Sequence, residues 1–200
     1  FFCNAYQLKL RDNYTHSASY NLEDLNSIQV VKDYFKASII HPLAMTSGIA
    51  FTKSSFLEVG GFNTHISSGQ DIDLWIRFAL QKTIVFNPAV TACYDRTVPD
   101  SLSKKQLRKV KFEFLNAYKS AENSNASFKK YLDLNRYSVA LHCKYHNDTE
   151  TLDKFLKAID LTSLNAKQRF LLALPNFVLI RLKKIQRLLI NKGIYLTAFK

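Results

Sequence analysis

Residues 58–63, Glu-Val-Gly-Gly-Phe-Asn, and residues 70–78, Gln-Asp-Ile-Asp-Leu-Trp-Ile-Arg-Phe, decide the fold class of this chain. Ser55 and Glu58 have the spacing of a capping box, in which each side chain satisfies a free amide of a first helical turn. Glycine is the residue that most easily takes the left-handed conformation after a helix. The pattern therefore predicts a short helix from Ser55 to the Gly60-Gly61 pair.

A second helix is expected from about Gln70 to Lys82, and it carries two acidic residues in its first turn. Free amides at a helix start stabilise a carboxylate, so Asp71 is expected to be ionised and able to accept a proton from a hydroxyl. Asp73 is four residues from Arg77, the spacing of an ion pair within a helix. The alternative is that these are ordinary first-turn acids and that Trp75 belongs to the core.

The segments around this pair of helices alternate between strand-like and polar composition, which favours an α/β fold for the first hundred residues. Five Gly and four Pro in 200 residues, with 47% hydrophobic residues, indicate a globular chain. We expect strands at 1–10, 44–52 and 83–90, with 92–94 extending the last, a loop at 11–22 and a weak helix at 24–35.

The remainder of the chain has helical periodicity and a different charge. Residues 1–100 carry a net charge of −1 and residues 101–200 a net charge of +13. We predict one domain at 1–102 and an all-helical, basic region at 103–200. Its helices are expected at 103–122, 125–146, 150–159, 166–174 and from about 176 to 193. The excess charge indicates phosphate-rich partners, unless it is only a solvated face.

Three blocks occur in order: Ser47-Gly48-Ile-Ala-Phe-Thr-Lys53, Phe56-Leu-Glu-Val-Gly-Gly-Phe-Asn63 and Gln70-Asp-Ile-Asp-Leu-Trp-Ile-Arg77. Together they resemble the second half of a family-two glycosyltransferase domain, over about residues 1–103. That resemblance implies part of a GT-A fold and transfer from a nucleotide-sugar with inversion at the anomeric carbon. The apolar opening at Phe1 fits a fragment that lacks the upstream nucleotide-binding strands.

The resemblance also implies roles for single residues. Asp71 corresponds to the general base, which takes the proton of the acceptor hydroxyl. Arg96 lies after the last strand, in the segment that corresponds to a loop closing over the donor pyrophosphate and the acceptor, and is the implied phosphate contact. The alternative is that this segment is a polar linker. The remaining substrate-binding residues implied are Gln70, Ser47, Gly48, Gly61 and Trp75.

Two features depart from the family pattern. Gln70 stands where the family has Glu, which removes a charge beside the base. The Asp-x-Asp metal motif of the family has no counterpart, because Asp71 and Asp73 belong to the base motif. The divalent metal, Mg²⁺ or Mn²⁺, is therefore expected only in the full-length enzyme, and the fragment is expected to be inactive alone.

Cysteine and histidine offer no other site. Cys3, Cys93 and Cys143 are far apart in apolar contexts, which predicts buried free thiols. His142 and His146 are four residues apart on one helix, which suits zinc, but a solvated helix end is the preferred interpretation.

The last helix mixes apolar residues with cations, and residues 170–194 resemble the helical tail of Bacteroidetes glycosyltransferases. We expect its apolar side to pack on the preceding helices and its cations to contact an anionic membrane in addition. The sequence thus predicts a cytoplasmic enzyme, peripheral on the inner membrane, that adds sugar to a saccharide or lipid-linked acceptor for surface polysaccharide or lipopolysaccharide. The alternative is a non-catalytic basic module that binds nucleic acid or an anionic membrane.

Overall fold

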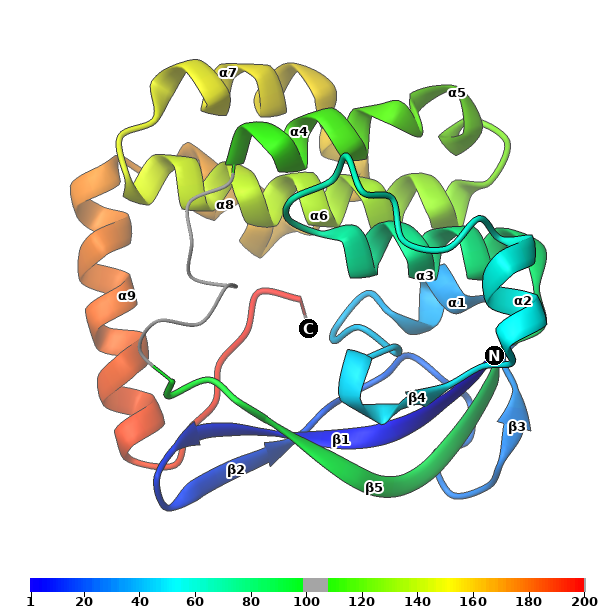
Figure 1. The fold of residues 1–200 in the computed structure, drawn as a ribbon. Coiled ribbons are helices and arrows are strands. Elements are labelled where there is room, and N and C mark those ends of the chain that lie inside the picture. Colours follow the sequence, from blue (N-terminus) through cyan, green and yellow to red (C-terminus); the bar gives the residue numbers. More distant parts are fainter. Residues whose placement is uncertain (99–107, 200) are drawn as a thin grey trace. The chain divides into compact units, whose positions relative to one another are not determined.

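Strand β1 (Phe2–Arg11) pairs in parallel with β5 (Val85–Asp95), although more than 70 residues separate them in the chain. Its buried side chains, Cys3, Ala5, Tyr6 and Leu8, anchor the pair in the core. Three short strands complete a mixed sheet in the order β2-β1-β5-β3, with β4 beside the start of β1 (Figure 1). They are β2 (Tyr14–Ser17), β3 (Gln29–Val30) and β4 (Ile49–Ala50).

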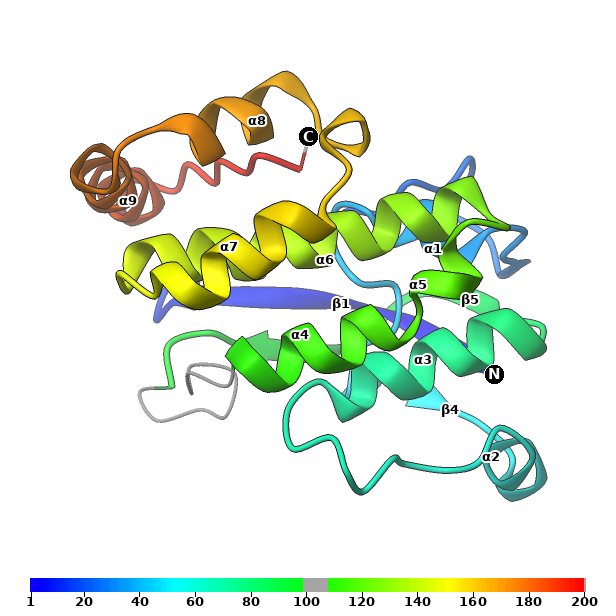
Figure 2. The ribbon, with the colours of Figure 1, turned by 90° about the horizontal axis from the view of Figure 1, so that it is seen from above.

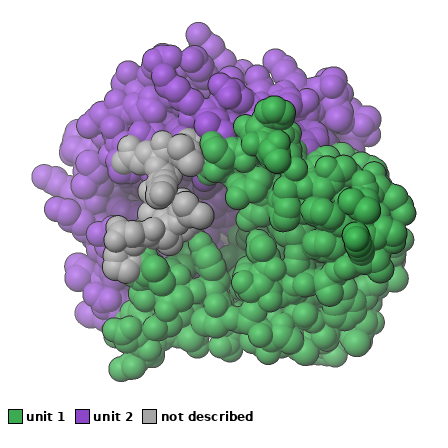
Figure 3. Space-filling model, viewed as in Figure 1, with its two compact units in different colours: residues 1–103 green, residues 104–200 purple. Residues whose placement is uncertain are grey.

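The structure is a computed structural model that describes residues 1–98 and 108–199. It divides into two compact units, residues 1–103 (unit 1) and 104–200 (unit 2), which Figure 3 distinguishes by colour. Unit 1 is mixed α/β. The described part of unit 2 consists of helices and connecting turns without a strand.

The sheet curls where β5 contains a proline. Asn4 pairs with Asn87, but the next residue, Ala5, pairs with Val90, so Pro88 and Ala89 form a bulge. Proline has no N–H to donate to a strand ladder and is therefore confined to such irregularities or to sheet edges. The side chains of Asn87 and Asn4 join across the bulge at 2.8 Å.

Three expectations for unit 1 were wrong. The predicted strand at 44–52 is reduced to β4, because the chain first turns through the 3₁₀ helix η1 (Thr46–Gly48). The predicted loop at 11–22 contains β2, which pairs with β1 as an edge strand and needs no fully apolar face. The predicted helix at 24–35 is reduced to α1 (Tyr34–Ala37). Here the Asp24 carboxylate accepts hydrogen bonds from the Asn26 amide and the Ser27 hydroxyl, which competes with helix formation.

Helix α2 (Lys53–Glu58) begins earlier than predicted, because its N-cap is Thr52 and not Ser55. The Thr52 hydroxyl accepts from the Ser55 amide at 3.1 Å, and Glu58 pairs with Lys82 instead of closing a capping box. The predicted end is correct: Gly60 and Gly61 have φ angles of +86° and +63°. Helix α3 (Gln70–Gln81) follows close to its predicted bounds.

Unit 2 is built around α6, to which all its other long helices pack. Figure 2 shows α7 alongside α6, and α4, α8 and α9 also contact it. The bounds lie close to prediction where the structure describes them, except that the helix predicted at 103–122 is divided at Tyr118 into α4 and α5. The expected start of that helix at 103 lies outside the described residues. The helices are α4 (Arg108–Ala117), α5 (Lys119–Glu122), α6 (Ala126–Tyr145), α7 (Thr149–Ala158), α8 (Ala166–Ala173) and α9 (Asn176–Asn191), with the 3₁₀ helix η3 (Leu161–Ser163).

A buried ion network holds α6 in place. The Arg136 guanidinium, 1% exposed, lies 2.7 Å from Glu122 and 3.0 Å from Asp133. Asp133 also accepts from Lys129 at 3.2 Å and from the Ser163 hydroxyl at 2.8 Å. Charged groups this deeply buried are tolerated only when they are paired and hydrogen-bonded. The network therefore ties α5, α6 and η3 together at one fixed register.

Candidate functional site

The carboxylate of Asp71 lies at the start of α3, as the sequence predicts. Gly69, with a φ of +92°, is the N-cap and brings the chain into the helix. One oxygen, Oδ1, accepts from the Ile72 amide at 2.9 Å, and the other, Oδ2, receives a longer contact of 3.4 Å from the Thr46 hydroxyl. The carboxylate is half-buried. One oxygen is thus fixed by the backbone, and the other faces an exposed hydroxyl.

The Thr46 contact brings η1 beside the first turn of α3. Ser47 and Gly48 follow Thr46 in η1, and Gln70, the first residue of α3, directly precedes Asp71. A Cβ atom on Gly48 would lie 3.6 Å from the Asn4 carbonyl oxygen and 3.9 Å from Cβ of Ala92. Gly48 thus packs against the bulged middle of β1 and β5, which sets the position of η1. Sequence reasoning missed Thr46, although it directly precedes the Ser47-Gly48 pair.

Arg77 joins α3 to the glycine turn. Its guanidinium donates to the Asp73 carboxylate at 2.7 and 3.0 Å, to the Gly61 carbonyl at 2.7 Å and to the Val59 carbonyl. The predicted Asp73–Arg77 pair is confirmed, and its carboxylate side is buried, since Asp73 is 5% exposed. Two carbonyls at a helix end are satisfied by one planar multi-donor group. The pair therefore fixes the glycine turn against the helix that carries Asp71.

We expect Arg77→Lys to lower the free energy of unfolding of unit 1 by about 1–3 kcal/mol, because an ammonium group cannot reach the carboxylate and both carbonyls at once. Urea unfolding followed by the fluorescence of Trp75, the single tryptophan, measures this. Gln81→Ala, an exposed position at the end of the same helix, is the matched control. Equal unfolding midpoints for Arg77→Lys and the unchanged chain would show that the contacts of the Arg77 guanidinium add no stability.

Trp75 lies beneath the site in an aromatic cluster. Its ring stacks on Phe1 at 5.4 Å between centroids and lies 6.2 Å from both Phe51 and Phe78. Since Trp75 is 3% exposed, the indole has almost no surface left for a ligand. Trp75 is therefore a core residue, as in the alternative interpretation of the sequence, and its packing holds α3 in place.

Gly61 has a structural reason to be glycine. A Cβ atom there would lie 3.3 Å from two ring atoms of Phe56, in addition to the strain of the positive φ angle. Its carbonyl is held by Arg77.

Arg96 follows β5 and is exposed. Its backbone amide donates to the Lys9 carbonyl at 2.9 Å, which prolongs the β1–β5 ladder by one bond. The neighbouring Asp95 accepts from the hydroxyl and amide of Thr97, and these bonds, with the Lys9 ammonium, lower its pKa to about 2. The structure does not bring Arg96 into contact with Asp71 through any bond among the described residues. Residues 99–107, which follow, lie outside the described part of the chain.

The end of α6 is only in part the solvated helix end that the sequence predicts, because His146 is exposed but the preceding residues are not. His142 is half-buried, and burial together with the nearby charges of His146, Arg108, Lys111 and Lys183 lowers its pKa to about 4. Lys144 donates to the carbonyls of Leu172 and Leu174, the last turn of α8. No group of three or more metal-ligating side chains occurs within residues 1–98 and 108–199.

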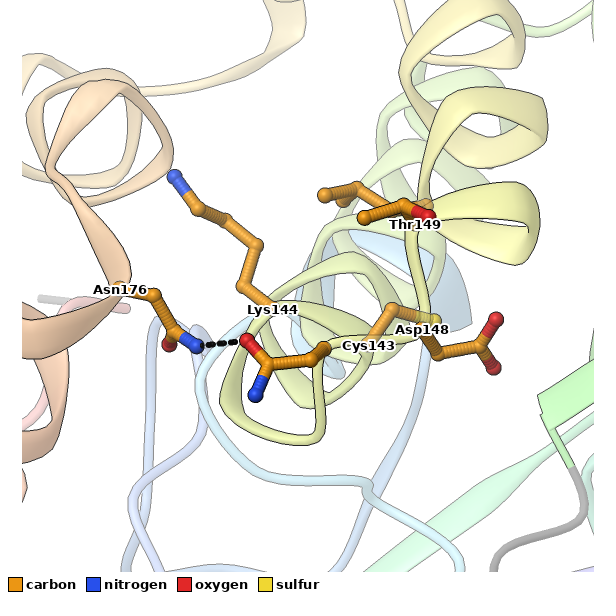
Figure 4. Close-up of a pocket in the computed structure, with 7 residues that line it drawn as sticks. Cys143, Lys144, Asp148, Thr149 and Asn176 are labelled. Atoms are coloured by element: carbon orange, nitrogen blue, oxygen red, sulfur yellow. Dashed lines mark hydrogen bonds between the residues drawn. The ribbon is translucent and has the colours of Figure 1, made fainter.

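A hollow of about 200 Å³ lies on unit 2 where α6, α7 and α9 meet (Figure 4). Two polar pairs at the hollow join neighbouring elements: Asn176 donates to Asn147, and Asp148 pairs with Arg108 at 2.9 Å. Burial raises the pKa of the Cys143 thiol to about 11, so this cysteine is protonated and unreactive. We interpret the hollow as a helix junction and not as a ligand site.

The other two thiols differ. Cys3 is buried as predicted, and burial raises its pKa to about 12. Cys93 is exposed on β5, which corrects the prediction that all three are buried. Its side chain points away from the core because strand residues alternate between faces.

No protein-family model, no curated protein and no solved structure matches this chain. The interpretation of the site therefore rests on its own geometry and on the motifs of the sequence. Of the predicted site residues, Gln70 adjoins Asp71 in α3, and Ser47 and Gly48 follow Thr46, whose hydroxyl contacts Asp71.

Proposed function

We propose that this chain carries the acceptor side of an inverting, GT-A-type glycosyltransferase and that Asp71 is its general base. The observation that carries the proposal is the anchoring of Asp71 at the first turn of α3, beside η1. The mixed α/β character of unit 1 is compatible with such a domain. The order of the three sequence blocks is the further support.

The reaction assigned to this carboxylate is a single displacement. The acceptor hydroxyl oxygen attacks C1 of the donor sugar, and its proton passes to Asp71. The bond between C1 and the nucleoside diphosphate breaks on the opposite face, and the diphosphate leaves with the electron pair. Since Oδ1 is held by the Ile72 amide, Oδ2 is the oxygen assigned to receive the proton. A positioned base of this kind contributes typically 10²–10⁴-fold to a rate.

The donor site is not assigned to the described residues. Asp73 is committed to Arg77, so Asp71 and Asp73 do not fit as a metal-binding pair. In that family the nucleotide-binding motif precedes these blocks, so activity is to be tested in a chain that includes that part.

The proposal includes a saccharide or lipid-linked acceptor and a cytoplasmic reaction that serves surface polysaccharide synthesis.

The test is the configuration of the product. A chain that joins these 200 residues to a nucleotide-binding half of the family type is incubated with α-linked nucleotide-sugars and saccharide or lipid-linked acceptors, and the anomeric proton coupling of the product is measured by NMR. We expect a β-linked product. A product with retained α configuration would exclude the direct displacement, and absence of transfer to every acceptor class would count against a transferase.

A further inference from the structure

The last fifth of the chain contains no acidic residue. From Leu161 to Lys200 there are eight cations and neither Asp nor Glu. They are Lys167, Arg169, Arg181, Lys183, Lys184, Arg187, Lys192 and Lys200. A segment with a net charge of +8 over 40 residues attracts anionic surfaces and repels a second copy of itself.

Within this segment, α9 has large apolar residues on its outward side. Leu179 is the buried residue of this helix, at 0% exposure. With about 100° of rotation per residue, Phe177 and Leu188 lie on the side opposite Leu179. They are 62% and 61% exposed. A helix on the surface of a soluble unit normally has its polar residues there.

Cations share that outward side. Arg181 and Lys184 lie between Phe177 and Leu188, one turn apart, and all four residues fall within about 60° of the helix circumference. The Arg181 guanidinium lies 5.9 Å from the centre of the Phe177 ring. Ile185, 50% exposed, widens the apolar strip toward the end of the helix. The expectation that the apolar side of this helix mainly packs on preceding helices is therefore wrong.

The combination of outward apolar side chains and cations distinguishes between the possible binding partners of this face of α9. Nucleic acid would use the cations, but a phosphate backbone offers no partner for an outward Phe and Leu. A second copy would cover the apolar residues only by bringing two acid-free segments together. A bilayer with anionic lipids satisfies both features, because phosphates pair with the cations while the apolar side chains enter the boundary between headgroups and acyl chains.

We propose that the outward face of α9, defined by Phe177, Arg181, Lys184 and Leu188, binds the surface of an anionic lipid bilayer with the helix parallel to the membrane plane. No described helix is both long enough and apolar enough to cross the membrane itself. The proposal concerns unit 2 alone and does not depend on sugar transfer by unit 1. For a lipid-linked acceptor, however, it would place the enzyme where its substrate lies.

The experiment uses the 200-residue chain and two sets of vesicles, phosphatidylcholine alone and phosphatidylcholine with one third phosphatidylglycerol. We expect co-sedimentation with the anionic vesicles only, and its decrease as salt rises. The double variant Phe177→Ser with Leu188→Ser is expected to weaken binding at least tenfold. The control is Leu161→Ser, which removes another apolar side chain that is 51% exposed. Circular dichroism verifies that each variant is folded.

A second readout reports insertion directly. Phe177→Trp adds an outward tryptophan to a chain whose own Trp75 is buried. The emission of this variant is expected to move to shorter wavelength with anionic vesicles, whereas Leu161→Trp is expected to give no shift. Equal binding to both vesicle types, undiminished binding of the double variant, or an unchanged emission spectrum of the Phe177→Trp variant would overturn the proposal. A dimer dispersed by the double variant, or duplex DNA bound more tightly than vesicles, would overturn it as well.

Discussion

Asp71→Asn is expected to lower glycosyl transfer by about 10²–10⁴-fold while donor binding stays near its original value. Asparagine has the shape of aspartate, so it can still accept from the Ile72 amide and contact the Thr46 hydroxyl. It cannot take a proton from the acceptor. The loss is therefore expected in kcat and not in the affinity for the nucleotide-sugar.

The measurement is transfer of labelled sugar by a chain that joins these residues to a nucleotide-binding half of the family type, with donor affinity determined separately by calorimetry. Glu58→Gln is the matched control, because it also converts a carboxylate to an amide in unit 1 but lies at the exposed end of α2. It is expected to keep activity within about twofold, consistent with a surface substitution. If Asp71→Asn transfers sugar as fast as the unchanged enzyme, Asp71 is not the base.

Arg136→Met is expected to lower the free energy of unfolding of unit 2 by about 3–5 kcal/mol, the cost of breaking a buried ion pair by removing one partner. The methionine fills most of the space. It leaves Glu122, with a side chain 6% exposed, and Asp133, at 0%, without their cation. Lys129 still pairs with Asp133, which limits the loss on that side.

Urea unfolding followed by far-UV circular dichroism measures this loss, because most of the described helical residues lie in unit 2. Trp75 fluorescence gives a separate probe of unit 1. Lys130→Met, an exposed position on the same helix, is the control and is expected to change stability by no more than about 0.5 kcal/mol. Similar midpoints for the two variants would indicate that the network contributes specificity of packing and little stability.

Local sequence was sufficient for most helices. The helix predicted at 125–146 is found as α6, with Asn125 accepting from the Phe128 amide as its N-cap. The helix predicted at 166–174 is found as α8, which begins with a capping box between Asn165 and Gln168. Helix bonds join residues four apart and caps join residues three apart, so the information lies within one short stretch.

Predictions from local sequence were wrong where a remote strand supplied hydrogen-bond partners or where a nearby polar side chain took the place of the expected cap. The polar residues 14–17 became a strand because β1 offered them a ladder. Ser55 did not cap α2 because Thr52, three residues earlier, accepted from its amide.

The sequence by itself determined most helices of unit 2, the glycine turn, the start of α3 at Gln70 and the ion pair of Asp73 with Arg77. Only the tertiary structure decided that Arg77 also holds the Val59 and Gly61 carbonyls, that Thr46 approaches Asp71, and that Arg136 is buried between two acids. The physical reason is distance along the chain. These partners are separated by 14 to 25 residues or lie on different helices, apart from the Asp133–Arg136 contact within α6. A pattern within one stretch of sequence does not specify which remote group will form a hydrogen bond or an ion pair with it.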